Sequence, residues 1–280
     1  MKTLIVGGTS SIGKSLVPVF TPFGEVLTAG RKNCDIKLDL NNSVEEMVLP
    51  ENLDVIIHTA AAFKGNTNEE ILETESINVL GTLKLCQAAV KANVKFFIMI
   101  SSIFSSLNEN SPFYNIYSIS KRQAEEVAKF YCSKHSLPLA ILKPSQVYGN
   151  LASFEKNQPF FYLMIKKAEK GENITLHGSK NPYRNYIHIN DLTTIILKVA
   201  QNRIEGTYSC AHRENISYVQ IAGILYKVFG TEGKVEFMED KPNISDNVFE
   251  FDNSLYEKIN FYPIVSIEEG LKLIAKEGLK

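Results

Sequence analysis

The 280-residue sequence has few cysteines, almost no net charge and no long apolar run, and each shortage excludes a class of protein. Its four cysteines form no Cys-x-x-Cys pair, which argues against a disulfide framework and a zinc site. Thirty basic and 31 acidic side chains give a net charge of -1, so no positive field would hold nucleic acid or an anionic membrane. The N-terminal apolar run, residues 4–6, is too short for a signal peptide or a membrane span. We therefore expect a cytoplasmic protein that binds no metal, nucleic acid or membrane.

Short apolar runs alternate with segments of helical spacing along the first half of the chain. The runs are rich in β-branched residues and short enough for strands buried on both faces: residues 3–6, 25–29, 36–38, 54–58, 95–100 and 137–142. Helical spacing occurs at residues 12–20, 44–48, 71–92 and 117–135. This alternation is typical of an α/β fold with a doubly wound parallel sheet, a Rossmann fold, which binds ligands at the carboxyl ends of its strands.

The pattern changes after residue 149. Helices are expected at residues 160–170, 191–202 and 217–229, and short strands at 174–176, 186–188, 207–209 and 235–237. We predict a dinucleotide-binding domain over residues 1–150, to which part of 186–215 returns, and a smaller C-terminal α/β substrate-binding region over residues 151–280. No Gly/Ser-rich linker separates the two, so we expect them to share a cleft.

A glycine-rich turn at residues 7–13 follows the first predicted strand and opens a helix, which is the context that a dinucleotide motif requires. Gly7 permits a tight turn, and Gly13 allows the helix to pack closely on the strand. The small residues Ser10 and Ser11 let backbone N–H groups approach a pyrophosphate. The alternative is an ordinary turn between a strand and a helix.

The residues after the second predicted strand bear on the choice of cofactor. An acidic residue there would bind the ribose 2′-hydroxyl of NAD, whereas an arginine accommodates the 2′-phosphate of NADP. The sequence has Arg31 and Lys32 and no acid at this place, which favours NADP over NAD, unless both are ordinary surface charges. Asp39, after the third strand, either contacts the adenine amine or is a turn or N-cap residue.

Tyr117 and Lys121 are four residues apart and so share one face of a helix. A tyrosine with a pKa of about 10 is a poor acid–base catalyst at neutral pH, and we expect the neighbouring ammonium to lower that pKa. The same spacing recurs at Tyr162 and Lys166. Only the first pair follows a strand that ends in a serine, Ser102, able to bind a substrate oxygen. Tyr117 is therefore the candidate acid–base, and Tyr162 is expected to pack in the core.

These motifs follow one another along the chain in the order seen in the extended short-chain dehydrogenase/reductases of the nucleotide-sugar epimerase/dehydratase family, which the chain resembles along almost its whole length. The likeness is carried by residues 7–13, 39–40, 55–61, 78–82, 100–102, 117–121, 142–149, 184–192 and 265–271.

The resemblance implies a role for each matching residue. Tyr117 would be the acid–base, Lys121 would hold the nicotinamide ribose, and Ser102 would bind the reacting oxygen. The implied cofactor-binding residues are Gly7, Ser10, Ser11, Ile12, Gly13, Arg31, Asp39, Leu40, Ala60, Ala61, Asn78, Tyr117, Lys121, Pro144 and Val147. The implied substrate-binding residues are Ser102, Gln146 and Arg184, and the guanidinium of Arg184 suits a diphosphate. Asn78 either supports its helix or holds a water chain near Lys121.

The sequence also departs from the family pattern. Ser10 or Ser11 replaces the middle glycine of the turn, Lys143 replaces an arginine, and Gln146 replaces an asparagine. Residues 103–104 are Ile-Phe, where sugar-nucleotide dehydratases have an Asp-Glu pair, which argues against a 4,6-dehydratase.

The resemblance therefore predicts an NAD(P)-dependent enzyme that acts on a nucleotide-linked sugar, with a preference for reduction of a 4-keto sugar. The alternatives are a nucleotide-sugar 4-epimerase that retains NAD and, from another class, a non-catalytic NAD(P)-binding regulator. Relatives pair through long helices, so a homodimer built on residues 71–92 and 117–135 is expected.

Overall fold

The computed structural model describes residues 1–279, which form two compact units. The first unit comprises Met1–Pro144, Thr193–Cys210 and Asn253–Phe261. The second comprises Ser145–Leu192, Ala211–Asp252 and residues 262–279. Among residues 1–279, no helix is both long and apolar enough to span a membrane.

The first unit is built on a seven-stranded sheet in the order β10-β6-β5-β4-β1-β2-β3, and every pair of neighbours is parallel. Its strands are β1 (Thr3–Val6), β2 (Val26–Gly30), β3 (Ile36–Lys37), β4 (Val55–His58), β5 (Phe97–Ile100), β6 (Leu139–Pro144) and β10 (Gly206–Cys210). Strands β1, β4 and β5 are buried along their whole length, as the continuous apolar runs predict. The predicted parallel α/β sheet is confirmed.

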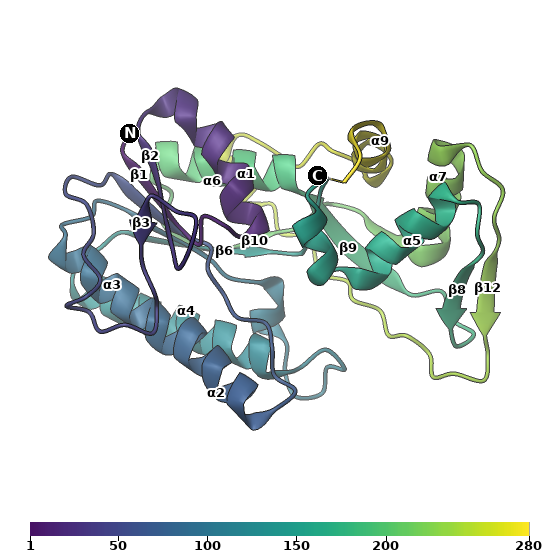
Figure 1. Cartoon of the computed structure of the whole chain (residues 1–280), viewed down its shortest axis with the longest axis horizontal. Helices are drawn as coiled ribbons and strands as arrows, with labels where there is room; N and C mark the ends of the chain where they lie inside the picture. The colour runs from purple at the N-terminus through teal and green to yellow at the C-terminus, as the bar shows by residue number, and fades with distance from the viewer. Residues whose placement is uncertain (280) are drawn as a thin grey trace. The chain divides into compact units, whose positions relative to one another are not determined.

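Helices cover both faces of this sheet (Figure 1). Helices α1 (Ser11–Phe20) and α6 (Ile189–Asn202) lie on one face, and α2 (Asn68–Glu75), α3 (Gly81–Lys91) and α4 (Ile116–Lys134) lie on the other. Helix α8 (Ser254–Ile259) packs beside β10. Small buried residues such as Ala89, Ala124 and Ala128 line the inner faces of α3 and α4, which lets both helices approach the sheet closely.

Two predicted helices of this unit differ in the structure. Residues 44–48 form turns instead of a helix, because a segment this short does not repay the cost of helix nucleation; its Met47 is nevertheless buried. The single helix predicted over residues 71–92 is divided into α2 and α3 by a π-helical turn, Ser76–Leu80. Such wide turns are frequent at functional sites, and this one contains Asn78.

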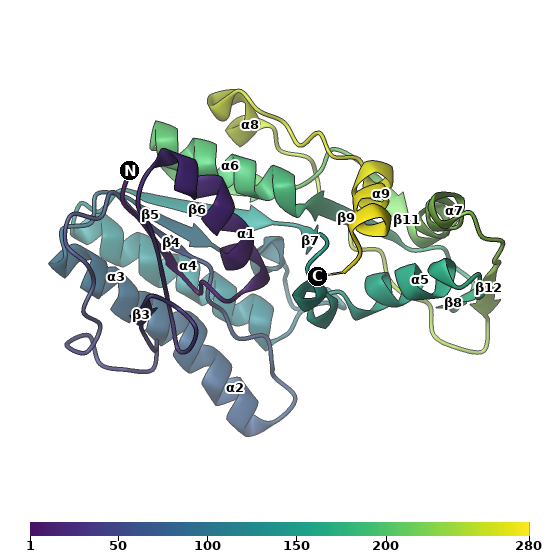
Figure 2. The same ribbon diagram turned by 45° about the horizontal axis from the view of Figure 1, so that its top comes forward.

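The second unit contains two small sheets and three helices, which Figure 2 shows from a second direction. Strands β7 (Gln146–Tyr148), β9 (Tyr183–His188) and β11 (Asn215–Ser217) form one sheet, and β8 (Ile174–His177) pairs with β12 (Val235–Met238) in the other. Helix α7 (Tyr218–Phe229) packs against both α5 (Pro159–Glu169) and α9 (Ile267–Glu277). The core is aromatic, since the rings of Tyr148, Phe161 and Tyr186 contact one another.

Candidate active site

Three neighbouring strands of the first unit end at the same edge of the sheet, and the predicted site residues follow them. Val6 at the end of β1 pairs with His58 at the end of β4, and His58 pairs with Met99 of β5. The glycine-rich turn, the loop that begins at residue 59 and the serines after β5 therefore lie at one edge. This is the place at which doubly wound folds bind ligands.

The glycine-rich turn after β1 cannot accept larger residues at its two ends. Gly7 has a φ of +88°, and a Cβ there would lie 2.6 Å from the backbone nitrogen of Ala60. A Cβ on Gly13 would lie 2.3 Å from the carbonyl oxygen of Gly7. Helix α1 starts at Ser11, so the positive end of its dipole lies at the strand edge. A tight turn that begins and ends with glycine at a helix N-terminus fits the diphosphate of a dinucleotide.

Ser10, which like Ser11 is a candidate for the position of the family's middle glycine, caps helix α1. Its Oγ accepts a hydrogen bond from the backbone nitrogen of Gly13 at 3.0 Å. The same Oγ lies 3.0 Å from the hydroxyl of Thr59. Ser10 therefore ties the turn after β1 to the loop after β4.

The end of β2 presents exposed basic residues, Arg31 and Lys32. The nearest acid, Asp35, points back at the strand: its Oδ2 accepts hydrogen bonds from the backbone nitrogen of Thr28 at 2.8 Å and from the Thr28 hydroxyl at 2.7 Å. These bonds lower the pKa of Asp35. Asp39 accepts a hydrogen bond from the backbone nitrogen of Asn41 at 3.0 Å, so it has the geometry of a turn residue.

Tyr117 lies in the first turn of α4, whose start is fixed by a capping box at Asn115. Burial raises the pKa of Tyr117 to about 12, and the neighbouring Ser102 hydroxyl opposes that shift. The ring of Phe63 stacks on the ring of Tyr117 with the centroids 4.7 Å apart and an interplanar angle of 25°. Phe63 has no sequence motif and was not predicted; its place in the loop directly after β4 was the available signal.

Lys121 lies one turn further along α4 and is only 3% exposed. Its Nζ donates a hydrogen bond to the carbonyl oxygen of Ile100 at 2.8 Å. Burial lowers the pKa of Lys121 to about 8, and the charge of Glu125 opposes that shift. The structure differs from the prediction that Lys121 lowers the pKa of Tyr117, because loss of hydration dominates and raises it.

Asn78 is buried and holds the loop after β4. Its Oδ1 accepts from the backbone nitrogen of Ala62 at 2.8 Å, and its Nδ2 donates to the Ala62 carbonyl oxygen at 2.9 Å. The Nδ2 also donates to the hydroxyl of Ser120 in α4 at 3.0 Å. These bonds favour the interpretation that Asn78 supports the backbone around Ala60 and Ala61; direct contact with a cofactor stays a prediction.

Pro144 ends β6 in the first unit, and the other predicted residues of this region belong to the second unit. Val147 pairs with Ile187 within the sheet of β7 and β9. The side-chain nitrogen of Gln146 donates to the side-chain oxygen of Gln158 at 2.9 Å. The role of Gln146 in substrate binding stays a prediction.

Arg184 is buried in the second unit at the strand β9. Its Nε donates to the hydroxyl of Tyr218 at 3.0 Å, and its Nη1 donates to the carbonyl oxygens of Tyr183 and Ser245, both at 2.8 Å. The guanidinium also lies over the ring of Tyr218, 4.7 Å from its centroid. These contacts fix the guanidinium in place, and its predicted contact with a diphosphate stays a prediction.

The second Tyr/Lys pair packs as expected. The Tyr162 hydroxyl is buried, donates to the carbonyl oxygen of Gly149 at 2.6 Å and accepts from its nitrogen at 3.1 Å. Lys166 forms an ion pair with Glu155 at 2.6 Å. The prediction that Tyr162 is a core residue is confirmed.

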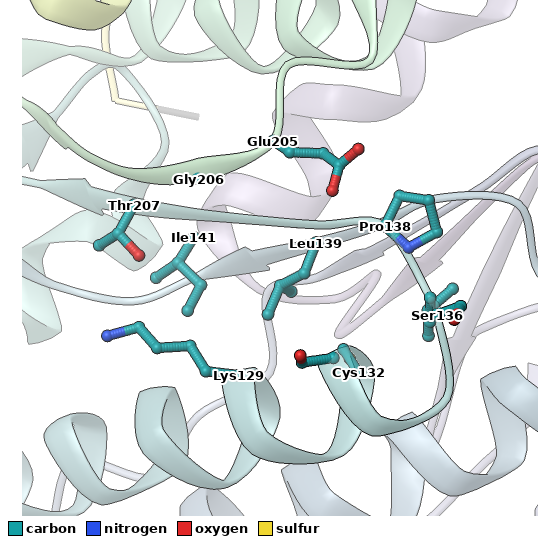
Figure 3. A pocket seen from close by; sticks show the side chains of 11 residues that line it. Lys129, Cys132, Ser136, Pro138, Leu139, Ile141, Glu205, Gly206 and Thr207 are labelled. Atoms are coloured by element: carbon teal, nitrogen blue, oxygen red, sulfur yellow. The ribbon is translucent and has the colours of Figure 1, made fainter.

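A pocket of about 670 Å³ lies in the first unit between the C-terminal half of α4 and the strands β6 and β10 (Figure 3). Lys129 and Cys132 line it from the helix, and Leu139, Ile141 and Thr207 line it from the strands. None of the predicted site residues lines this pocket. It is lined by the C-terminal half of α4, whereas Tyr117 and Lys121 lie in the first two turns of that helix.

Comparison with known proteins agrees with this geometry. Residues 3–211 match the NAD dependent epimerase/dehydratase family. The chain is 28% identical over 240 residues to the "dTDP-D-glucose 4,6-dehydratase" of Mus musculus, and this match covers 79% of the chain but 66% of the mouse protein. It is 26% identical over 305 residues to the "Low-salt glycan biosynthesis protein Agl12" of Haloferax volcanii, with 97% and 96% of the two chains covered.

A solved structure shows the same fold. The UDP-N-acetylglucosamine 4-epimerase from Bacillus cereus has a TM-score of 0.80 and 19% sequence identity, with 100% of this chain and 98% of that chain covered.

Proposed function

Because the chain belongs to the NAD dependent epimerase/dehydratase family, we propose that it transfers hydride between a nicotinamide nucleotide and a nucleotide-linked sugar. The reaction that we favour is reduction of a 4-keto sugar with NADPH. The observation that carries this proposal is the placement of Tyr117 and Lys121 one helical turn apart on α4, with Ser102 interacting with the Tyr117 hydroxyl.

The residues of the chain would bind the cofactor and move one proton. The turn between Gly7 and Gly13 would hold the diphosphate, and Lys121 would hold the nicotinamide ribose. A bound nicotinamide nucleotide would supply the hydride. Ser102 would orient the sugar oxygen, and the Tyr117 hydroxyl would give it a proton. With a pKa of about 12, Tyr117 is a neutral phenol at pH 7, which is the form that donates a proton to a carbonyl oxygen during reduction.

The surroundings of β2 support NADPH over NADH. Arg31 is exposed directly after this strand, where a 2′-phosphate would lie. The carboxylate of Asp35 is bonded to Thr28, so the acid nearest to Arg31 is already engaged within the protein.

Two alternatives use the same scaffold. An epimerase would use the same Ser102, Tyr117 and Lys121 but would have to retain its cofactor between oxidation and re-reduction, and the fold match with a 4-epimerase supports this second candidate. A dehydratase is disfavoured because Ile103 and Phe104 stand where a carboxylate pair would act. A non-catalytic regulator is disfavoured because Ser102, Tyr117 and Lys121 are all present.

Cofactor analysis tests the proposal. The protein is purified without added nucleotide and denatured, and any released nicotinamide nucleotide is identified by mass spectrometry. We expect little bound nucleotide and a higher affinity for NADPH than for NADH in a fluorescence titration. Arg31→Ala should remove that preference, whereas Lys134→Ala, an exposed cation at the end of α4, should leave it unchanged. Stoichiometric NAD would instead establish the epimerase, and binding of neither nucleotide would refute the enzyme.

Tyr117→Phe separates catalysis from binding. We expect it to abolish NADPH-dependent reduction while the affinity for NADPH stays unchanged. Turnover at the wild-type rate would contradict the assignment of Tyr117 as the proton donor.

We also propose that the protein works as a homodimer in the reducing cytoplasm, to which a sequence with four scattered cysteines and no Cys-x-x-Cys pair is suited. Leu72 of α2, Leu80 of the π-helical turn and Phe130 of α4 are 70%, 57% and 68% exposed, and such apolar side chains on a helical face suit an interface with a second copy. Sedimentation at micromolar concentration should show a dimer, and Phe130→Glu should shift it to a monomer. A wild-type monomer would refute the dimer.

A further inference from the structure

A buried carboxylate, Glu125, lies one helical turn after Lys121 on α4, and the mechanism above gives it no role. Glu125 is 4% exposed and Lys121 is 3% exposed. Residues four apart on a helix are neighbours on one face. Removing a carboxylate from water costs several kcal/mol unless donors and cations compensate, so a carboxylate at this position has to be balanced by what surrounds it.

Two strands supply that compensation. The hydroxyl of Ser101, at the end of β5, donates a short hydrogen bond to Oε1 of Glu125. The Nζ of Lys143, from β6, lies 4.0 Å from Oε2. Lys143 is itself held by a hydrogen bond to the hydroxyl of Ser106 at 2.5 Å. The carboxylate is thus fixed from the β5 and β6 side of α4, on the helix that carries the candidate active-site lysine.

Among the groups that interact with Lys121, Glu125 is the one that carries a negative charge. Tyr117, on the same helix, is a neutral phenol at neutral pH. His58, from β4, interacts electrostatically with Lys121 and is neutral because burial lowers its pKa to about 3. The carbonyl oxygen of Ile100 accepts a hydrogen bond from Lys121 but carries no net charge. The charge of Glu125 opposes the effect of burial on Lys121.

We propose that Glu125 is a positioning residue that keeps Lys121 protonated at neutral pH, so that a full positive charge is present beside Tyr117. The proposal deepens the proposed function and rests on it for the use of that charge in cofactor binding and proton transfer. The placement of Glu125, by contrast, rests on distances and burial within the first unit alone.

The expected size of the effect follows from the separation of the charges. A nearby opposite charge shifts a pKa by about 1–3 units, and Glu125 is one turn away and buried, so its loss should lower the pKa of Lys121 by about one unit or more. With a starting pKa of about 8, such a shift would leave a large share of Lys121 uncharged at pH 7.5. One unit corresponds to about a tenfold change in the ratio of charged to neutral amine.

The test is a pH titration of Lys121 followed by nuclear magnetic resonance. Lysine is labelled with ¹³C, the Cε signal of Lys121 is assigned through Lys121→Arg, and its titration is compared in wild type, Glu125→Gln and Glu125→Asp. Glutamine keeps the shape and an acceptor for Ser101 but removes the charge. The matched control is Glu126→Gln, the next residue of α4, whose side chain is 68% exposed and pairs with Lys129.

We expect Glu125→Gln to lower the pKa of Lys121 by about one unit or more, Glu125→Asp to lower it less, and Glu126→Gln to leave it unchanged. A wild-type titration of Lys121 in Glu125→Gln, with an unchanged circular dichroism spectrum, would overturn the proposal. If Glu125→Gln does not fold, Glu125→Asp decides: a lowered pKa supports the proposal, and an unchanged one refutes it.

This experiment needs neither cofactor nor substrate, so its result is independent of the proposed function. If the wild type binds no NADPH and reduces no sugar, the function fails while the titration still decides the role of Glu125. If both hold, the NADPH affinity of Glu125→Gln should fall more steeply than that of wild type as the pH rises from 6.5 to 8.5, and Glu125→Asp should partly restore it.

Discussion

Replacing Gly13 by alanine tests the packing of the glycine-rich turn. The added Cβ would lie 2.3 Å from the carbonyl oxygen of Gly7 and 3.0 Å from both the Gly7 carbonyl carbon and the Cα of Gly8. All three neighbours are backbone atoms, which cannot move aside as the end of a flexible side chain can. Helix α1 must therefore move away from the turn, or the turn must deform.

The expected cost is the difference between two opposing effects. Overpacking a close-packed site costs about 1–3 kcal/mol, and a contact of 2.3 Å against backbone belongs at the upper end of that range. Alanine is a better helix former than glycine by about 1 kcal/mol, which offsets part of the loss. We expect Gly13→Ala to lower the free energy of unfolding by about 2 kcal/mol and to weaken NADPH binding at the same time.

Urea unfolding followed by circular dichroism measures the first quantity, and fluorescence titration with NADPH measures the second. Gly223→Ala is the matched control, because Gly223 lies inside α7 and a Cβ there would meet nothing within 4 Å. It should raise the free energy of unfolding by up to about 1 kcal/mol and leave NADPH binding unchanged. A Gly13→Ala protein that unfolds at the wild-type urea concentration and binds NADPH normally would refute the steric reasoning.

Three further predictions concern neighbouring residues. Phe63→Ala should lower the pKa of Tyr117 from about 12 because water then reaches the ring, and ¹³C tyrosine titration should show the shift; an unchanged pKa would mean that the stack does not desolvate the phenol. Asn78→Ala removes the paired hydrogen bonds to Ala62 and should cost about 2–3 kcal/mol in urea unfolding, whereas a cost below about 0.5 kcal/mol would rule out the supporting role. Burial lowers the pKa of His58 to about 3, so His58 stays neutral in the folded protein while it becomes protonated in the unfolded chain below pH 6.5. The difference in unfolding free energy between wild type and His58→Gln should therefore be constant above pH 6.5 and should change against wild type by about 1.4 kcal/mol per pH unit below it. An equal difference at pH 7 and pH 5.5 would contradict this.

The regular part of the fold was predictable because its elements are long or fully buried. Continuous apolar runs predicted the six parallel strands β1 to β6. Strands β7 and β11 were missed because each is three residues long and mixes polar with apolar side chains, so neither forms an apolar run. The π-helical turn was missed because its residues keep helical spacing, and the widening depends on contacts made in the folded chain.

The sequence predicted the site residues whose role depends on the residue type alone, such as a glycine at a position that accepts no side chain. Gly7 and Gly13 were identified from their spacing, and the structure shows why neither accepts a Cβ. The roles of polar side chains were less accessible, because a sequence does not show which partners a side chain finds. Asn78 bonds to the backbone of Ala62, and Arg184 bonds to the hydroxyl of Tyr218 and the carbonyl oxygen of Ser245, and these partners are distant in sequence.

The pKa of Tyr117 is a property that the four-residue spacing between Tyr117 and Lys121 does not determine. A separation of four residues predicts that a phenol and an ammonium are neighbours, and the expectation of a lowered pKa assumes that both remain hydrated. In the structure Lys121 donates a hydrogen bond to the Ile100 carbonyl oxygen and interacts with the charge of Glu125, while the ring of Phe63 stacks on the ring of Tyr117. Burial raises the pKa of Tyr117 and keeps the phenol protonated. A protonated phenol donates a proton rather than accepting one. The raised pKa of Tyr117, which follows from the packing of the site, therefore agrees with the proposed reaction, the reduction of a keto group.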